Sequence, residues 1–227
     1  MSEANKLPQL AVIGGTGKEG SGLARRWAAA GYSVIIGSRT PEKAETAAAA
    51  HNQFLGRQAV RGMSNEQAAW EAEVVILTVP YSAHQATLET IRQAVQGKVL
   101  IDVTVPIRPP VTVVDLPGGH SAAQEAQAYL GDGVRVVSAF QNVSAVHLKE
   151  PGHRVECDVL VTGNDTEAKE IAIRLAEAAG MRGIDAGVLA NAVAAESLTP
   201  VLLAINKRYG ITGAGIRITG LDEESAG

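Results

Sequence analysis

The sequence predicts an α/β fold: a doubly wound, mostly parallel sheet with a smaller C-terminal α/β domain. Short β-branched runs such as Val74–Val79 alternate with Ala-rich segments, which is typical of buried parallel strands covered by helices. A glycine-rich turn follows the first apolar run and precedes the first helical segment. Aromatic residues make up only 4% of the chain, so aliphatic side chains are expected to fill its core.

Composition excludes several classes of protein. The chain has 227 residues, 46% of them hydrophobic and 19% charged, with a formal net charge of −4. No basic run is longer than two residues, so we expect no nucleic-acid partner and no anionic membrane partner. No apolar stretch preceded by basic charge marks a signal peptide or membrane anchor near the N-terminus, so we expect a cytoplasmic protein.

Metal and redox-cysteine chemistry are also not indicated. The single cysteine, Cys157, has no partner for an internal disulfide, and no CxxC motif is present. The five histidines lack metal-ligand spacing, and we expect them at the surface. Gly119-His120-Ser121 only half resembles a nucleophile elbow and follows a Pro/Gly loop rather than a strand, which argues against a serine hydrolase.

The first predicted domain, residues 1–140, alternates strands with helices. We expect strands at Leu10–Ile13, Ser33–Ile36, Val74–Val79, Val99–Val103 and Val134–Ala139. We expect helices at Gly20–Ala30, Pro41–His51, Ala83–Ala94 and Ser121–Leu130. Residues 104–120 contain four prolines and are predicted to form a long irregular connection, a type of loop that is often functional.

The second predicted domain, residues 141–227, begins where the alternation of strands and helices changes. We expect strands at Asp158–Thr162 and Gly183–Asp185, with a helix at Thr166–Ala179 between them. The longest helical stretch is Leu189–Arg208, and Pro200 is expected to kink or break it.

The glycine turn predicts a dinucleotide site. Gly15, Gly17 and Gly20 fit the pattern G-x-G-x-x-G, and they lie between a strand and a helix in a βαβ unit. The first glycine allows the tight turn, the second lets the backbone approach the pyrophosphate, and the third lets helix and strand pack closely. A Walker-type loop is excluded, because Glu19 rather than Ser or Thr follows Lys18.

The end of the second strand predicts which dinucleotide binds. NAD-binding units place an acidic residue there, whereas NADP-binding units use basic and small polar residues. Here the strand ends Gly37-Ser38-Arg39-Thr40, and Lys43 follows one turn later. Arg39 can pair with the 2′-phosphate and Ser38 can donate a hydrogen bond, so we expect NADP(H).

The remaining strand ends indicate the reaction. Thr78-Val79-Pro80 and Thr104-Val105-Pro106 repeat one small, mostly apolar turn, and Phe140–Val143 follows the last strand of the first domain. Ligands of open α/β sheets lie beyond these carboxyl ends. No evident acid, base or nucleophile is present, so we predict no catalytic side chain. Hydride transfer between two flat rings needs mainly alignment and therefore fits such a surface.

The chain resembles the NADPH:coenzyme F-420 oxidoreductase family, whose members pass hydride between NADP(H) and an 8-hydroxy-5-deazaflavin. The resemblance covers nearly the whole chain, and the C-terminal block is its more specific part. It rests on GGTG at 14–17, GSR at 37–39, LTVP at 77–80, VP at 105–106, VVSA at 136–139, ESLTP at 196–200 and the glycine-rich ending at 213–216.

The resemblance implies roles for particular residues. NADP(H) would contact Thr16, Gly17, Lys18, Glu19, Ser38, Arg39, Lys43, Val79, Ala83 and Ala145, beside Gly15, Gly20, Thr78 and Pro80 of the predicted turns. The second substrate, coenzyme F-420, would occupy a pocket formed by Thr104, Val105, Pro106, Gln141, Asn142, Val143 and Pro200. The C-terminal domain would close the active site and form the surface of a homodimer.

One departure bears on the second substrate. The family pattern has a histidine and a proline where this chain has Gln141 and Ser144. Two alternatives therefore stay open beside reduction of F-420 or a related flavin. One is an NADP-dependent imine or carbonyl reductase, although about 85 C-terminal residues leave little room for the long helical domain of such enzymes. The other is a non-catalytic NADP(H)-sensing module. Homodimerisation also rests on the apolar residues Val201, Leu202, Leu203 and Ile205.

Overall fold

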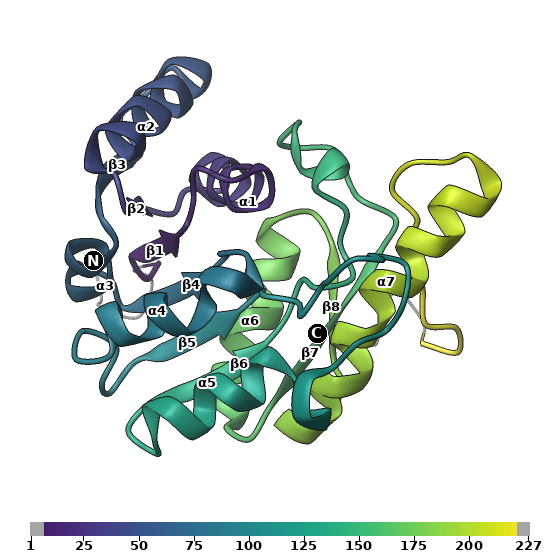
Figure 1. Cartoon of the computed structure of the whole chain (residues 1–227). Helices are drawn as coiled ribbons and strands as arrows, with labels where there is room; N and C mark the ends of the chain where they lie inside the picture. Colours follow the sequence, from purple (N-terminus) through teal and green to yellow (C-terminus); the bar gives the residue numbers. More distant parts are fainter. Residues whose placement is uncertain (1–6, 222–227) are drawn as a thin grey trace.

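The computed structural model describes residues 7–221 and forms one eight-stranded sheet with helices on both faces (Figure 1). The strand order is β3-β2-β1-β4-β5-β6-β7-β8. The strands are β1 (Leu10–Ile13), β2 (Val34–Ser38), β3 (Val60–Ser64), β4 (Val74–Leu77), β5 (Val99–Asp102), β6 (Arg135–Ser138), β7 (Asp158–Gly163) and β8 (Arg182–Asp185). The predicted α/β, doubly wound fold class is confirmed.

The helices divide between the two faces of the sheet. Buried side chains from α1 (Lys18–Ala29), α2 (Pro41–Leu55) and α6 (Thr166–Ala178) share one hydrophobic core. Those from α3 (Asn65–Glu71), α4 (Tyr81–Ile91), α5 (Ala122–Leu130) and the first residue of α7 (Ala192–Tyr209) share the other. Short 3-10 turns η2 (Pro117–Gly119), η3 (Ala145–Leu148) and η4 (Leu189–Asn191) lie in the connections.

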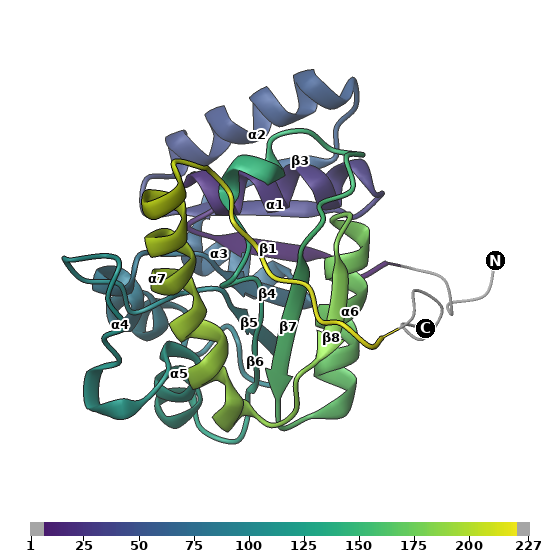
Figure 2. The ribbon, with the colours of Figure 1, turned by 90° about the vertical axis from the view of Figure 1, so that its right-hand side faces the viewer.

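The alternation of strands and helices changes near residue 140, and the direction of the strands changes at the same place. Neighbouring strands from β3 to β6 are parallel, whereas β6 and β7 are antiparallel and β7 and β8 are again parallel. β7 and β8 therefore extend the same sheet, with α6 beside them (Figure 2). The division of the chain at residue 140 stays a prediction.

Two local features differ from the sequence-based expectation. We predicted neither β3 nor α3, because Val-Arg-Gly-Met-Ser lacks an apolar pattern and α3 has only seven residues. The break expected at Pro200 does not occur, since α7 is continuous from Ala192 to Tyr209. Pro200 is buried, and packing keeps this turn helical although proline cannot donate the usual backbone hydrogen bond.

The C-terminal helical stretch is unusually apolar for a helix that is only partly covered. Leu189–Tyr209 has a mean hydropathy of 1.3 over its best window, one third of which is buried, and by length and composition alone it could cross a membrane. It also carries the fully buried Glu196, whose carboxyl accepts hydrogen bonds from α5. We therefore interpret it as a packed helix with one exposed apolar side, which includes Val201.

Candidate functional site

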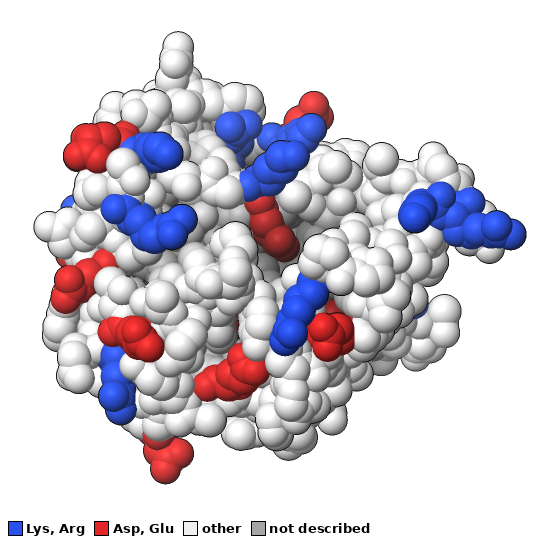
Figure 3. Space-filling model, viewed as in Figure 1, with Lys and Arg blue, Asp and Glu red and all other residues white. Residues whose placement is uncertain are grey.

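A pocket of about 490 Å³ lies beyond the carboxyl ends of the parallel strands, where an open α/β sheet binds its ligands. Figure 3 shows a hollow on this face with basic side chains along its upper rim. The pocket brings most of the predicted residues together: Thr16, Gly17, Lys18, Glu19, Ser38, Arg39, Lys43, Thr78, Val79, Pro80, Ala83, Thr104, Val105, Gln141 and Val143 all line it.

The other two predicted glycines lie beneath the pocket, where helix and strand meet. A Cβ atom on Gly20 would lie 2.3 Å from Thr78 Oγ1, and one on Gly15 would lie 2.8 Å from Val12 O. Neither position has room for a larger residue. These two glycines therefore serve the close packing of α1 on the sheet, and Gly17 lines the cavity itself.

Besides Gly15 and Gly20, four residues predicted for the site do not line this pocket in the described part of the chain: Pro106, Asn142, Ala145 and Pro200. Asn142 is turned away, because its Nδ2 donates to Asp158 O at 2.6 Å. Ala145 begins η3, which packs against α1, and Pro200 is buried within α7. Their neighbours in sequence reach the pocket instead, namely Val105, Gln141, Val143 and Thr199.

Basic side chains gather at the β2 end of the pocket. β2 ends at the buried Ser38, and the exposed Arg39 and Lys43 follow it on either side of the first residue of α2. Lys18, also exposed, stands at the first position of α1. Ser38 Oγ accepts a hydrogen bond from Thr40 N at 3.1 Å and so holds this turn. The arrangement suits an anionic phosphate.

The sequence analysis missed Asn65 at this end. Asn65 follows β3, and Ser64 pairs in register with Ser38 of β2. Its side chain is buried, and a Cβ atom on Gly37 would lie 2.9 Å from Asn65 Oδ1. The oxygen thus lies over the end of β2. The capping box between Ser64 and Gln67 indicates that a helix starts here, but it does not indicate that Asn65 lines the pocket.

Three buried oxygens that line the pocket have no hydrogen-bond partner among the described residues: Glu19 Oε1, Asn65 Oδ1 and Gln141 Oε1. Leaving a buried polar atom unpaired typically costs about 1–3 kcal/mol. Such atoms are uncommon in native proteins and call for a specific reason. Their gathering in one cavity fits a ligand that brings hydrogen-bond donors, as the amide, hydroxyl and amino groups of a nucleotide do.

Gln141 is held firmly although it follows a strand end. Its Nε2 donates to Asp102 O at 2.6 Å, and its main-chain oxygen accepts from Thr199 Oγ1 at 2.7 Å. Its side chain is buried at 3% exposure. Its Oε1 has no hydrogen-bond partner among the described residues, so Gln141 presents a fixed acceptor at the end of the pocket next to β5.

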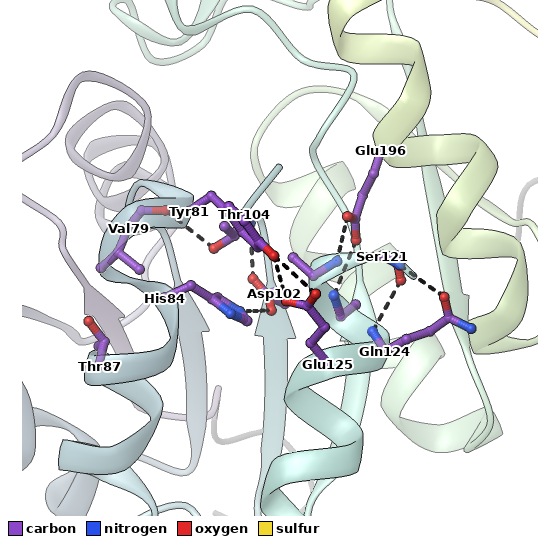
Figure 4. Close-up of polar contacts among 12 residues, drawn as sticks. Val79, Tyr81, His84, Thr87, Asp102, Thr104, Ser121, Gln124, Glu125 and Glu196 are labelled. Carbon is purple, nitrogen blue, oxygen red and sulfur yellow. Dashed lines mark hydrogen bonds and ion pairs between the residues drawn. The ribbon is translucent and has the colours of Figure 1, made fainter. Parts of the chain in front are cut away.

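A buried ion pair lies behind this end of the pocket (Figure 4). His84 Nε2 lies 2.7 Å from Asp102 Oδ2, and both side chains are inaccessible to solvent. Burial opposes the charged imidazole, but the charge and hydrogen bond of Asp102 outweigh it and raise the pKa of His84. Asp102 Oδ1 also accepts from Thr104 N at 3.0 Å. The pair therefore fixes the turn that carries Thr104.

The expectation that the histidines lie at the surface is wrong for His84 and for His51. His51 is buried between α1 and α2, where Arg25 Nε donates to its Nδ1 at 3.1 Å. Burial, assisted by Arg25, lowers the pKa of His51 to about 4. Both histidines are buried because a polar partner from a distant part of the chain satisfies them, which spacing within the sequence does not reveal.

The fold and the pocket together define a class of protein, a Rossmann-type dinucleotide-binding oxidoreductase. Residues 9–106 match a family described as "NADP oxidoreductase coenzyme F420-dependent". Over 224 residues the chain is 46% identical to the F420-dependent NADP reductase of Methanothermobacter thermautotrophicus, covering 95% of this chain and 97% of that one. The protein belongs to the F420-dependent NADP reductase family.

One solved structure agrees with this assignment. The crystal structure of a protein described as an F420-dependent NADP-reductase, from Arthrobacter sp. FB24, is 27% identical with a TM-score of 0.77 and covers 94% of this chain and 100% of its own. A pyrroline-5-carboxylate reductase from Coxiella burnetii is 18% identical with a TM-score of 0.58, over 91% of this chain and 73% of its own. The second likeness concerns the fold alone.

Proposed function

We propose that this protein transfers hydride between NADP(H) and coenzyme F-420 in the pocket at the carboxyl ends of the strands. The observation that carries the proposal is that one cavity joins the residues predicted for NADP(H), such as Arg39, to those predicted for the second substrate, such as Gln141. The names of the closely similar relatives support the same pair of substrates.

The NADP(H) end of the pocket is the end of β2. The backbone N–H groups at the start of α1 and the glycine turn suit the pyrophosphate. Arg39 and Lys43 would neutralise the 2′-phosphate, and no acidic side chain among the described residues lining the pocket follows β2. This arrangement favours NADP(H) over NAD(H).

The second substrate would lie toward β5 and β6. Thr104, Val105, Val143 and Thr199 line this part with small side chains, and Gln141 Oε1 offers one fixed acceptor. The nicotinamide supplies the chemistry, which is gain or loss of a hydride. The protein's part is to align two flat rings and to keep water away, a contribution that can reach roughly 7–11 kcal/mol.

Absorbance measurements test the proposal. Purified protein is mixed with NADPH and F-420, and then with free flavin or pyrroline-carboxylate in place of F-420. We expect turnover with F-420, weaker turnover with NADH, and a loss of the NADPH preference in Arg39→Ala. Turnover only with the carboxylate would favour the imine or carbonyl reductase. Tight NADPH binding without turnover on any acceptor would favour the sensor.

We further propose that two copies associate through the exposed apolar side of α7. One third of the most apolar window of this helical stretch is buried, and so is Leu202, whereas Val201 and Tyr209 are 43% and 72% exposed. Light scattering is expected to give the mass of a dimer, and Val201→Glu is expected to give a monomer. A monomeric mass for the unchanged protein would contradict this proposal. A cytoplasmic location likewise stays a prediction.

A further inference from the structure

Phe140 has a backbone conformation that is rare for a bulky residue. Its φ angle is 75°, and no other non-glycine residue in the described part of the chain has a positive φ. A side chain crowds the backbone in this left-handed region, so mainly glycine adopts it. Such strained residues persist only where their surroundings hold them, and they cluster at binding and catalytic sites. Phe140 lies two residues after the end of β6 and directly before Gln141, which lines the pocket.

The ring of Phe140 is anchored in the core on one face of the sheet. It is fully buried and meets the ring of Trp27 edge to face, with 5.8 Å between the ring centroids and 76° between the planes. Trp27 is itself fixed, because its Nε1 donates to Leu175 O of α6 at 2.8 Å. Both rings belong to the core that α1, α2 and α6 share. The packing of the ring therefore stabilises a backbone conformation that the residue would otherwise avoid.

The chain turns sharply at Phe140. Ala139 N donates to Asp102 O at 3.3 Å, and two residues later Gln141 Nε2 returns to the same oxygen at 2.6 Å. Val143 N donates to Phe140 O at 3.0 Å and closes the turn. The ring of Phe140 thus lies in the core, while Gln141 and Val143 on the same turn line the pocket.

We propose that Phe140 is a positioning residue for the second substrate: its anchored ring holds the left-handed turn that places Gln141 Oε1 in the F-420 end of the pocket. Glycine would adopt this turn without strain but would leave it free to move. A turn that is fixed before binding loses less conformational freedom when the substrate binds. The inference rests on the proposed function, since it concerns the same pocket.

Two substitutions that remove the ring test the inference. Phe140→Gly and Phe140→Ala differ by one methyl group, which strains the left-handed backbone only in the alanine variant. At an ordinary φ the glycine variant would be the less stable of the two, so we expect the reverse, a higher urea midpoint for Phe140→Gly. KM for F-420 should rise in both variants, and in Phe140→Ala by roughly fivefold, the effect of losing one neutral hydrogen bond. The dissociation constant for NADPH should stay nearly unchanged.

Two further variants separate positioning from a general loosening of the core. Leu10→Ala opens a cavity in the same core, but Leu10 is the first residue of β1, at the end of the strand away from the pocket. It should lower the urea midpoint and leave KM for F-420 unchanged. Gln141→Ala removes the acceptor itself. Adding Phe140→Ala to it should raise KM little further, because both substitutions remove the same interaction with the substrate.

The outcomes separate the inference from the proposed function. A normal KM for F-420 in Phe140→Ala, an equal rise in Leu10→Ala, or fully additive effects of Phe140→Ala and Gln141→Ala would overturn the inference alone. A lower urea midpoint for Phe140→Gly than for Phe140→Ala would do the same. Tight NADPH binding by the unchanged protein without turnover of F-420 would overturn the proposed function and, with it, the inference. Unchanged NADPH affinity verifies that each variant is folded.

Discussion

At the scale of single residues, Asn65 shows what a local pattern misses. It lies beside Ser38 and Arg39 in the pocket, and a second cavity of about 540 Å³ shares all three residues and continues between α3 and α4. Because Arg39 is expected to hold the 2′-phosphate, the unpartnered oxygen of Asn65 would face the adenosine half of the nucleotide. Adenine and ribose both carry groups that can donate to it.

Asn65→Ala should therefore weaken NADPH binding by removing one hydrogen bond. A loss of about 1 kcal/mol, or roughly fivefold in the dissociation constant, is expected for one neutral bond. Titration with 2′,5′-ADP, which contains only the adenosine half, should show the same loss, while nicotinamide mononucleotide should bind unchanged.

The matched control for Asn65 is Gln67→Ala. Gln67 completes the capping box at the start of α3 and does not line either cavity among the described residues. If Asn65 acts only by shaping the start of this helix, both substitutions should weaken binding equally. A normal affinity of Asn65→Ala for 2′,5′-ADP would contradict the assignment.

The site residues that could be predicted are those whose role can be recognised from the residues next to them in the sequence. The glycine turn and Ser38-Arg39 were identified because a strand before and a helix after fix their geometry. Asn65 lies in the pocket because the strand before it, β3, pairs with β2. His84 is buried because it pairs with Asp102, which lies 18 residues away in the sequence. Contacts between separate strands and helices leave no trace in local spacing, so these residues could not be found from the sequence.

At the scale of the elements, Glu196 joins α7 to α5. Its carboxyl oxygens accept from Ala122 N at 2.7 Å and Ala123 N at 3.2 Å, at the start of α5 (Figure 4). Burial, with a smaller effect from the charge of Asp102, raises the pKa of Glu196 to about 8, although the two N–H groups oppose the change. The sequence predicts that Glu196 lies in a helix, but it does not reveal which residues Glu196 contacts.

The raised pKa of Glu196 makes a prediction about stability. A carboxyl whose folded pKa exceeds its unfolded value contributes stability that is full below pH 4.5 and is lost as the pH rises through 8. Glu196→Gln stays neutral throughout. Its free energy of unfolding, relative to the unchanged protein, should therefore rise between pH 5 and pH 9, by about 1.4 kcal/mol for each unit of pKa shift.

Urea denaturation at the two pH values measures this difference. Glu167→Gln is the control, since Glu167 is 84% exposed in the first turn of α6 and should show little pH-dependent gain. No gain in Glu196→Gln would show that Glu196 is ionised in the folded protein at neutral pH, and an equal gain in both variants would show that the effect does not come from the burial of Glu196.

At the scale of the whole molecule, the C-terminal residues are tied to the first helix by buried polar contacts. Arg26 of α1 is 2% exposed and donates to five main-chain oxygens. These belong to His147, Leu148, Glu150, His153 and Ala179. The neighbouring Trp27 donates from Nε1 to Leu175 O of α6 at 2.8 Å. One hydrophobic core contains residues from both sides of position 140.

These contacts predict that residues 7–140 and 141–221 unfold together, although the sequence suggests two domains. Arg26→Met would leave five carbonyl groups without their donor, and the expected loss is more than about 3 kcal/mol. The urea transition should shift to lower concentration as one step, with circular dichroism and tryptophan fluorescence coinciding. Arg174→Met, at a 60% exposed side chain, should leave the midpoint nearly unchanged.

If the two parts were separately stable, two transitions would appear and Arg26→Met would move only one of them. The pocket combines Arg39 before position 140 with Thr199 after it, so a single cooperative unit would also keep the two ends of the active site in register.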